Sequence, residues 1–515
     1  MRKLKKQYQP IAFSLVLIAG ILIGHNLLNT PEEKQLFQIH QTSKIGNILG
    51  LIQKDYVDTI NLEKLEENAI NSILKELDPH STYINPKNIK SVNEDMKGSF
   101  GGIGIEFNIQ QDTIVVVSPI SGGPSERLGV KSGDRIVVVD KENVASIGIE
   151  NKGVIDRLRG EIGTKVNVKI KRKNEKSLID YAIIRGEIPL YSLDIKRMLT
   201  SEIGYIKLNR FSGTTIDEFM EAAKLLLNSG MQKLILDLRG NPGGYLGAAI
   251  SVSNQFLNGK EMIVFTEGRN RKKQEFHADK SGLLTQTKVI VLVDEGSASA
   301  SEIVAGALQD NDRAIIVGRR TFGKGLVQEQ IPLFDGSAVR LTTQRYYTPT
   351  GRSIQKPYEN GKSKNYFLEV YEREEKESIR TTDSLIFTTP KGNIVYGGGG
   401  ITPDIFVHSD TTLDSKELSI FFSKNWIFDF CFDYADRHRE TLTKGGLIVR
   451  DVFVDFLSFV KSKNEDFVFD LNANEKDYLI KQIKANIGRN LWGNEIFYEI
   501  LLEEDRFIKQ AINEL

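Results

Sequence analysis

The sequence predicts a multidomain α+β protein, in which a mostly β domain precedes an α/β domain and helical segments lie at both ends. Three observations predict this organisation. The 515 residues are enough for roughly three or four domains of ordinary size. Short β-rich runs separated by glycines fill residues 101–188. Strand and helix patterns then alternate over residues 191–408, and helical periodicity dominates on either side of these two regions.

The composition excludes several classes of function. Lysine and arginine number 68 and acidic residues number 68, so the chain has no basic surplus with which to hold nucleic acid. The single cysteine, Cys431, can form neither an internal disulfide nor a thiolate metal site. The six histidines include no short-spaced pair, which disfavours a zinc hydrolase. We expect no metal, no cofactor and no nucleic-acid partner.

The first 30 residues predict a signal anchor. A basic stretch at residues 2–6 precedes an apolar run of 18 residues at 11–28, which is the lower limit for a spanning helix. A cleaved signal peptide is the alternative, but no Ala-x-Ala cleavage site and no lipid-acceptor cysteine follows the run. We therefore expect membrane attachment, with the rest of the chain in the periplasm or extracytoplasmic space.

The predicted elements follow in order along the chain. Helical spacing over residues 33–93 predicts a small helical unit. In the β domain we expect a helix at 153–159 and strands at 103–107, 113–117, 135–139, 166–171 and 177–184. Helical patterns return over residues 414–515, where the acidic and aromatic run around Cys431 is most simply a core helix.

The α/β domain is predicted from strands at 203–208, 234–238 and 288–293 with helices between them. The spacing Thr215-x-x-Glu218 predicts a capping box at the start of the first helix. A helix between consecutive strands implies a parallel crossover, and ligands of such sheets bind at the carboxyl ends of the strands. Two glycine-bearing turns, 237–244 and 294–302, stand at these ends.

Three serines in five residues open the helix that runs to Asp310. Ser299 and Glu302 have the spacing of a capping box, which explains the turn without any catalytic role. The same geometry suits a nucleophile, because free N–H groups at a helix start can stabilise an oxyanion. Gly243 and Gly244, in the neighbouring turn, can bring a second N–H close because they carry no side chain.

A serine nucleophile needs a base, and no histidine lies near these turns in sequence. Lys324, flanked by glycines and followed by an apolar strand, is a candidate. Its pKa would have to fall by roughly three units, or about 4 kcal/mol, which burial can achieve. An ordinary solvent-exposed turn lysine is the alternative. Gln328 could orient the amine or simply lie on the strand surface.

Four glycine-containing segments together resemble the carboxyl-terminal processing proteases, which are tail-specific Ser-Lys peptidases. They are Gly-Gly-Ile-Gly-Ile at 101–105, Asp-Leu-Arg-Gly-Asn-Pro-Gly-Gly at 237–244, Gly-Ser-Ala-Ser-Ala-Ser-Glu at 296–302 and Gly-Lys-Gly-Leu-Val-Gln at 323–328. The resemblance is strong over 97–408 and keeps the family's order. It implies these roles: nucleophile Ser299, base Lys324, assisting Gln328, and oxyanion N–H groups from Ala300 and from Gly243 or Gly244.

The resemblance also implies a crotonase-like protease domain preceded by a PDZ domain in the inserted position. Its carboxylate loop and peptide-binding strand would use Gly101, Gly102, Ile103, Gly104 and Ile105. Leu158 would help form the apolar pocket. Without the resemblance, a glycine-rich turn closing a small barrel explains the same residues.

The predicted domains are the anchor at 1–30, a helical domain at 31–96, the PDZ domain at 97–188, the protease domain at 189–410 and a second helical domain at 411–515. The predicted protein is a serine endopeptidase that captures apolar carboxyl-terminal tails and cleaves through an acyl-enzyme, and the helical ends suit a homodimer. A non-proteolytic PDZ-containing scaffold is the main alternative. A Ser-His-Asp hydrolase would need His277 or His408 brought in from elsewhere.

Overall fold

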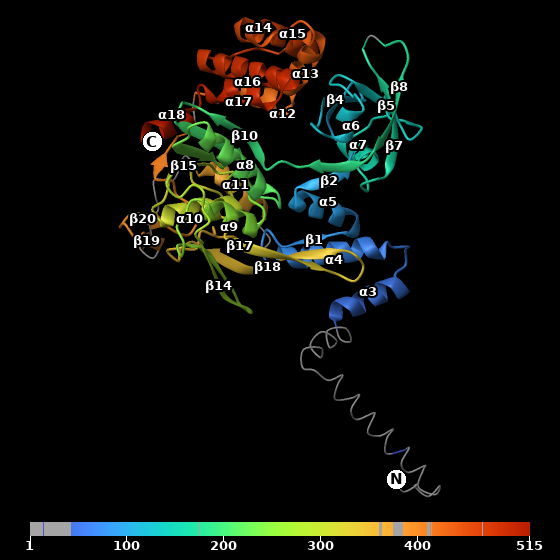
Figure 1. Ribbon diagram of the computed structural model, residues 1–515. Helices are drawn as coiled ribbons and strands as arrows, with labels where there is room; N and C mark the ends of the chain where they lie inside the picture. The colour runs from blue at the N-terminus through green and yellow to red at the C-terminus, as the bar shows by residue number, and fades with distance from the viewer. Residues whose placement is uncertain are drawn as a thin grey trace, which may run out of the picture. The chain divides into compact units, whose positions relative to one another are not determined.

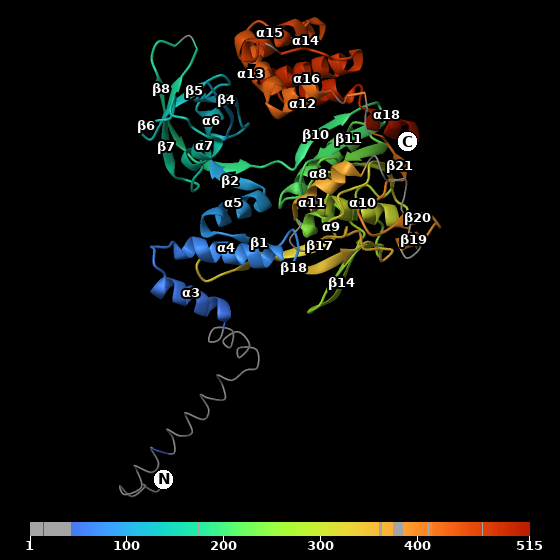
Figure 2. The same cartoon turned by 180° about the vertical axis from the view of Figure 1, so that it is seen from behind.

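The structure is a computed structural model that describes residue 14 and residues 43–173, 175–359, 363–373, 385–408, 412–413, 415–465 and 467–515. The chain divides into two compact units, Met1–Leu77 and Asp78–Leu515. Figures 1 and 2 show the described helices and strands from opposite sides. Except for Ser14, the predicted anchor at 11–28 lies outside the described residues. Among the helices that the structure describes, none combines the length and the apolar character of a membrane span.

The described helices are α3 (Lys44–Asp55) and α4 (Leu62–Lys75) in the first unit, and in the second unit α5 (Pro86–Lys97), α6 (Pro124–Arg127), α7 (Asn151–Leu158), α8 (Thr215–Asn228), α9 (Leu246–Asn254), α10 (Ala300–Asp310), α11 (Ser363–Glu372), α12 (Lys416–Ser423), α13 (Trp426–His438), α14 (Lys444–Val449), α15 (Phe453–Lys463), α16 (Ala473–Trp492), α17 (Asn494–Leu502) and α18 (Arg506–Glu514).

The described strands are β1 (Thr82–Ile84), β2 (Ser99–Gly102), β3 (Ile105–Gln110), β4 (Thr113–Pro119), β5 (Arg135–Val139), β6 (Glu142–Asn143), β7 (Lys165–Lys171), β8 (Ile179–Ile184), β9 (Gly186–Pro189), β10 (Leu193–Met198), β11 (Ile203–Leu208), β12 (Lys233–Asp237), β13 (Met262–Gly268), β14 (Arg271–His277), β15 (Lys288–Val293), β16 (Ile315–Gly318), β17 (Leu326–Pro332), β18 (Ala338–Tyr347), β19 (Ile386–Thr388), β20 (Ile394–Tyr396) and β21 (Ile405–Phe406).

The central sheet has the order β10-β11-β12-β15-β16-β21, and β11 onward are parallel. This confirms the predicted parallel crossovers. Alternate residues of each strand enter two separate cores, as the two-residue period of a strand requires. One face packs against α8, α9 and α10, and the other packs against residues of α17 and α18. Both faces of the sheet are therefore buried, as is usual for parallel strands.

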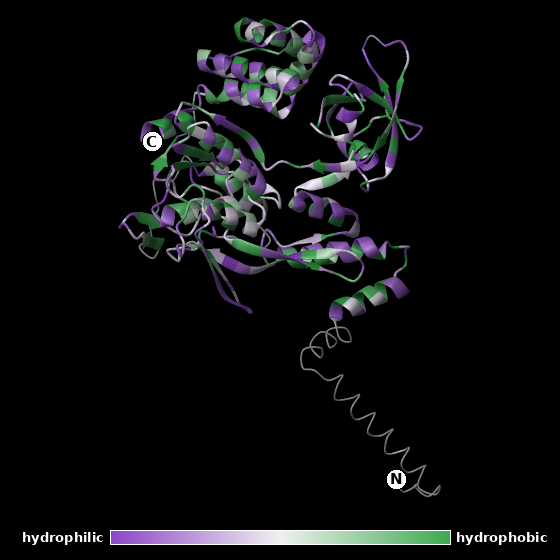
Figure 3. Ribbon diagram, in the orientation of Figure 1, coloured by the Kyte–Doolittle hydropathy of each residue, from purple (hydrophilic) through white to green (hydrophobic). Residues whose placement is uncertain are grey.

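A second sheet has the order β1-β18-β13-β14, with β17 paired to β18, and its strand β13 contacts helices α9 and α10. The edge strand β14 is mostly exposed and hydrophilic (Figure 3). Strand β17 begins two residues after Lys324, so this sheet carries the predicted base.

The predicted capping box at Thr215 is wrong. Thr214 is the N-cap of α8, and the Thr215 hydroxyl instead accepts a hydrogen bond from the N–H of Ser212 at 2.7 Å. Glu218 accepts hydrogen bonds from the N–H groups of Ser192 and Leu193 and from the hydroxyl of the N-cap Thr214, so it joins the start of β10 to the start of its own helix. Hydrogen bonds to residues distant in sequence therefore occupy one carboxylate oxygen of Glu218.

The β domain forms a sheet in the order β3-β4-β5-β7-β8, closed over a core that includes residues of α7. Its edge strand is β3, which begins at Ile105 and not at residue 103 as predicted. The carbonyl of Ile103 accepts a hydrogen bond from the N–H of Ser125, and Gly104 has a φ of +74°, so the chain turns before the strand starts.

The helices α12–α16 enclose a core of their own. Cys431 is completely buried there, and burial raises the pKa of its thiol well above the ordinary value. This confirms that the aromatic run around Cys431 is a core helix, α13.

Candidate active site

The predicted nucleophile lies at the sharp turn between β15 and α10. Ser299 has a φ of +53°, which is strained for a residue with a side chain and is often found at functional turns. The neighbouring serines are structural: Ser297 donates to the Leu238 carbonyl at 2.8 Å, and Ser301 donates to the Asn241 carbonyl at 2.9 Å. Both are completely buried, whereas Ser299 lines a cavity of about 620 Å³. The structure therefore separates Ser299 from the other two.

The predicted base lines the same cavity. The Lys324 Nζ donates to Gln328 Oε1 at 3.0 Å, as the sequence suggested. Burial, followed by the positive charge of Arg340, lowers the pKa of Lys324 from its ordinary value. An amine with a lowered pKa is present in its neutral form at lower pH, and only the neutral form can accept a proton.

A buried carboxylate joins the serine turn to the lysine turn. Glu302 is completely buried, and its Oε2 accepts hydrogen bonds from the N–H of Ser299 at 2.8 Å and the N–H of Lys324 at 2.9 Å. Its Oε1 accepts from the Thr321 hydroxyl at 2.6 Å and the N–H of Gly323 at 2.7 Å. Burial raises the pKa of Glu302, while these four donors favour its ionised form. One side chain thus fixes both turns.

A second link comes from Tyr346 on β18. Its buried hydroxyl lies 3.0 Å from the Ser299 carbonyl oxygen and 2.7 Å from the Lys324 carbonyl oxygen. Residues 299 and 324 are therefore linked through their N–H groups by Glu302 and through their carbonyl oxygens by Tyr346.

The turn after β12 brings further N–H groups to the serine. The Asn241 amide donates to the Leu208 carbonyl, and its oxygen accepts the N–H of Gly243 at 2.9 Å. Gly243 therefore already uses its N–H. Within the part of the chain that the structure describes, the N–H groups of Gly244 and Ala300 have no acceptor.

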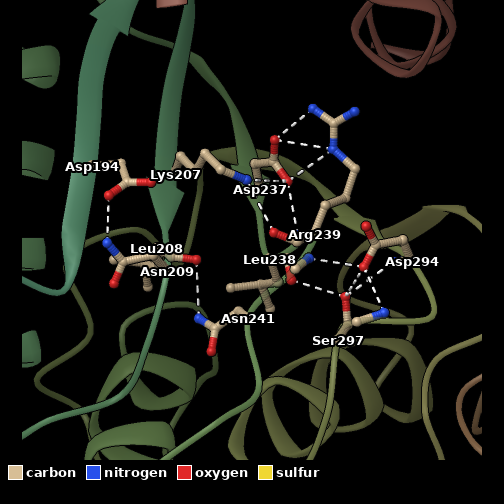
Figure 4. Close-up of polar contacts among 12 residues, drawn as sticks. Asp194, Lys207, Leu208, Asn209, Asp237, Leu238, Arg239, Asn241, Asp294 and Ser297 are labelled. Carbon is tan, nitrogen blue, oxygen red and sulfur yellow. Dashed lines mark hydrogen bonds and ion pairs between the residues drawn. The ribbon is translucent and has the colours of Figure 1, made fainter. Parts of the chain in front are cut away.

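Charged side chains bind one another at the start of this turn (Figure 4). Asp237 is completely buried, and although burial acts in the opposite direction, the charges of Arg239 and Lys207 hold the pKa of its carboxyl well below the ordinary value. Arg239 also pairs with Asp505 at 2.9 Å, while Asp294 accepts the N–H of Gly240 at 2.8 Å. Ionic and hydrogen-bond contacts therefore hold Asp237, Arg239 and Gly240 of this turn.

The predicted carboxylate loop lies in the β domain. Gly101 and Gly102 belong to β2, which pairs with β9, and a Cβ on Gly101 would lie 2.1 Å from the Gly160 carbonyl oxygen. Ile103 and Gly104 form the turn into the free edge of β3. Leu158, at the end of α7, is buried in the core together with Ile103.

The two histidines that a Ser-His-Asp hydrolase would need lie away from the site, as the sequence indicated. Neither His277 nor His408 lines the Ser299 cavity. Sequence reasoning missed His80, whose carbonyl oxygen accepts a hydrogen bond from Gln328 Nε2 at 2.6 Å. These two residues are 248 positions apart, so no local signal links them.

The comparisons with known proteins identify the chain as a serine-type peptidase. A family model for peptidase family S41 matches residues 202–366, and a PDZ domain model matches residues 101–183. A family of unknown function, DUF8443, matches residues 418–493.

The chain belongs to peptidase family S41 and is a member of its carboxy-terminal processing proteases. It is 39% identical over 344 residues to the carboxy-terminal-processing protease of Bartonella bacilliformis, covering 66% of this chain and 78% of that protein. It is 34% identical over 355 residues to the carboxy-terminal processing protease CtpB of Bacillus subtilis, covering 66% and 72%. Among solved structures, the photosystem II D1 C-terminal processing protease is 26% identical, with a TM-score of 0.38 and coverage of 72% and 88%.

The fold class predicted from the sequence is confirmed, and so is the activity class, a serine endopeptidase with a PDZ domain. The predicted domain limits and the roles of individual residues stay predictions.

Proposed function

We propose that this serine endopeptidase cleaves proteins through Ser299 and Lys324. The observation that carries the proposal is that both side chains line one cavity while Glu302 holds both of their N–H groups. Neutral Lys324 accepts the Ser299 proton as the hydroxyl oxygen attacks the scissile carbonyl. The protonated amine then gives that proton to the leaving nitrogen. The peptide bond breaks and an ester remains on Ser299.

The second half of the reaction repeats these transfers with water. Lys324 takes a proton from a water molecule that attacks the ester, and then returns it to the Ser299 oxygen as that bond breaks. The oxyanion of each tetrahedral intermediate is stabilised by the N–H groups of Ala300 and Gly244, because Gly243 gives its N–H to Asn241.

We assign tail recognition to the β domain. The free edge of β3 can accept a peptide as an added strand, and the turn at 103–104 can direct N–H groups toward a terminal carboxylate. An apolar last residue would bind between β3 and α7, near Leu158, against the apolar core of the domain. The substrate class is therefore a protein with an apolar carboxyl-terminal tail.

Amidation of the substrate tail tests this recognition. A protein substrate with an amidated carboxyl end should show a KM about tenfold or more above that of the free acid, because a charge-assisted hydrogen-bond site loses its anion. The kcat should change little. Equal cleavage of both substrates, measured by gel assay, would show that the terminal carboxylate is not recognised.

Arg340 should set the pH dependence of cleavage. Its positive charge lowers the pKa of Lys324, and activity requires the neutral amine. Arg340→Gln should therefore raise that pKa and move the acid limb of the kcat/KM profile to higher pH, which reports the free enzyme. Exposed Arg271, paired with Glu329, is the matched control, and Arg271→Gln should leave the limb in place.

Two further proposals concern the location and the assembly of the enzyme. We propose that residues 11–28 attach the enzyme to a membrane, that cleavage occurs on the extracytoplasmic side, and that the helical ends support a homodimer. Support comes from the apolar run behind its basic flank and from the apolar stripes of the terminal helices. Detergent dependence of extraction and light scattering of the purified chain test these two points.

A further inference from the structure

We propose that the turn Asp78-Pro79-His80-Ser81 is a positioning element for the catalytic base. In this arrangement the main-chain carbonyl of His80 holds the Gln328 amide with its oxygen toward Lys324. The inference rests on the proposed role of Lys324 as base.

The orientation of the Gln328 amide is the first step. Its Nε2 donates to the His80 carbonyl at 2.6 Å, and its Oε1 accepts from Lys324 Nζ at 3.0 Å. An amide has two different ends, and a carbonyl at one end accepts only from the NH₂ group. The His80 carbonyl therefore forces the amide oxygen to face the lysine. A neutral amine that donates one hydrogen to this oxygen has its lone pair directed elsewhere in the cavity.

The turn that presents the carbonyl is fixed by the Asp78 side chain. Its Oδ1 accepts the N–H groups of His80 and Ser81, each at 2.8 Å, and its Oδ2 accepts the Ser81 hydroxyl at 2.6 Å. The Ser81 hydroxyl in turn accepts the N–H of Thr342 at 3.1 Å. Directly after the turn, β1 pairs with β18, so the turn is joined to the sheet that carries Gln328.

A chain of hydrogen bonds connects the His80 ring to the turn that contains Lys324. His80 Nε2 lies 3.0 Å from the Tyr366 hydroxyl, which accepts from Gln355 Nε2 at 3.0 Å. The Gln355 oxygen accepts the N–H of Gly325, the residue after Lys324, at 2.8 Å. Because the Tyr366 oxygen receives one hydrogen from Gln355, its own hydrogen is available for His80 Nε2, which must then be unprotonated.

A neutral His80 ring is consistent with this chain of hydrogen bonds, in which its Nε2 accepts from Tyr366. Burial, followed by the positive charge of Lys324, lowers the pKa of His80 to about 4. The ring is therefore neutral at physiological pH and serves as an acceptor. Its edge-to-face contacts with Tyr366 and Phe367, at centroid distances of 5.3 Å and 5.7 Å, hold the ring in place.

Two variants of Asp78 test the turn. Asp78→Ala removes the acceptor for three hydrogen bonds, and kcat should fall about tenfold to a hundredfold with KM within about twofold of wild type. Asp78→Asn keeps an acceptor oxygen and should restore kcat to within about threefold.

Three charges act on Lys324: Arg340 on β18 lowers its pKa, whereas Glu302 on α10 and Asp78 raise it. Asp78→Asn should therefore also move the acid limb to lower pH.

A double-mutant cycle tests the ring. His80→Phe keeps the aromatic contacts but removes the acceptor, and Tyr366→Phe removes the donor. Each should lower kcat about threefold to tenfold. Because Tyr366→Phe removes the contact with His80 and also the contact with Gln355, the double variant should be no worse than Tyr366→Phe alone. Thermal unfolding is measured alongside to confirm that every variant is folded at the assay temperature.

Three results would overturn the proposal. The first is a folded Asp78→Ala enzyme with wild-type kcat and pH profile. The second is a loss confined to KM, which would place the turn in substrate binding. The third is full additivity in the His80 and Tyr366 cycle. Lys324→Ala is run in parallel: if that variant stays active, the base assignment itself has failed, whereas an inactive Lys324→Ala beside active turn variants refutes only the positioning role.

Discussion

Lys324→Ala should lower kcat/KM on a protein substrate about a thousandfold or more while the protein stays folded. The reason is that no second group replaces the base: among the described residues that line the Ser299 cavity, Lys324 and Arg340 carry the side-chain cations, and an arginine does not lose its proton in proteins. The measurement is steady-state cleavage across pH, with circular dichroism and thermal unfolding as checks on folding.

Lys324→Arg tests whether the side chain acts by accepting a proton or only by carrying a positive charge. This variant keeps a cation at the position, so it should retain the electrostatic environment and remain as inactive as Lys324→Ala. Lys356 is the informative comparison, because burial also lowers its pKa, to about 8. It contacts Glu369 and the Tyr366 carbonyl and does not line the cavity. Loss of activity in Lys356→Met together with normal activity in Lys324→Ala would transfer the base role to Lys356.

Gly243→Ala should also abolish activity, by at least about a hundredfold in kcat. Gly243 has a φ of +96°, and a Cβ there would lie 2.7 Å from the Ala298 carbonyl oxygen, 2.8 Å from the Ser299 Cβ and 2.8 Å from the Ala300 nitrogen. Two of these atoms are main chain and cannot rotate away. The methyl group would therefore displace the serine turn and fill the space in front of the Ala300 N–H.

Gly247→Ala is the matched control for this substitution. Gly247 lines the same cavity from helix α9, four residues further along, and a Cβ there meets no atom within 4 Å. Since alanine favours a helix over glycine by about 1 kcal/mol, this variant should be as active as wild type and slightly more stable. Equal activity of both variants would show that close approach at Gly243 is not needed.

Periodicity and turn chemistry made much of the fold predictable. The strand at 288–293 and the strand at 135–139 occur as predicted, because continuous apolar runs bounded by glycine or polar turns leave few alternatives. The order of the glycine motifs also predicted which turns meet at the sheet edge, since parallel strands present their carboxyl ends together. Lysine, glutamine and serine came together as expected.

The contacts that the sequence did not reveal are long-range or depend on single hydrogen bonds. Thr215 forms no capping box because the helix begins one residue earlier than predicted, with Thr214 as its N-cap, and the Thr215 hydroxyl accepts the N–H of Ser212. The difference between Gly243 and Gly244 depends on the Asn241 side chain, which accepts the N–H of one of them. The contact of Gln328 with His80 joins distant segments through a main-chain carbonyl, which has no residue-type signal at all.

The central claim is that Ser299 is a nucleophile activated by Lys324, and covalent labelling tests it most directly. The full chain is treated with a fluorophosphonate, which phosphonylates activated serines with loss of fluoride, and the site is located by peptide mass spectrometry. We predict modification of Ser299 in the wild type and none in Lys324→Ala, with the labelling rate rising as pH passes through the pKa of Lys324. Labelling at another serine, or equal labelling of Ser299 in Lys324→Ala, would contradict the account.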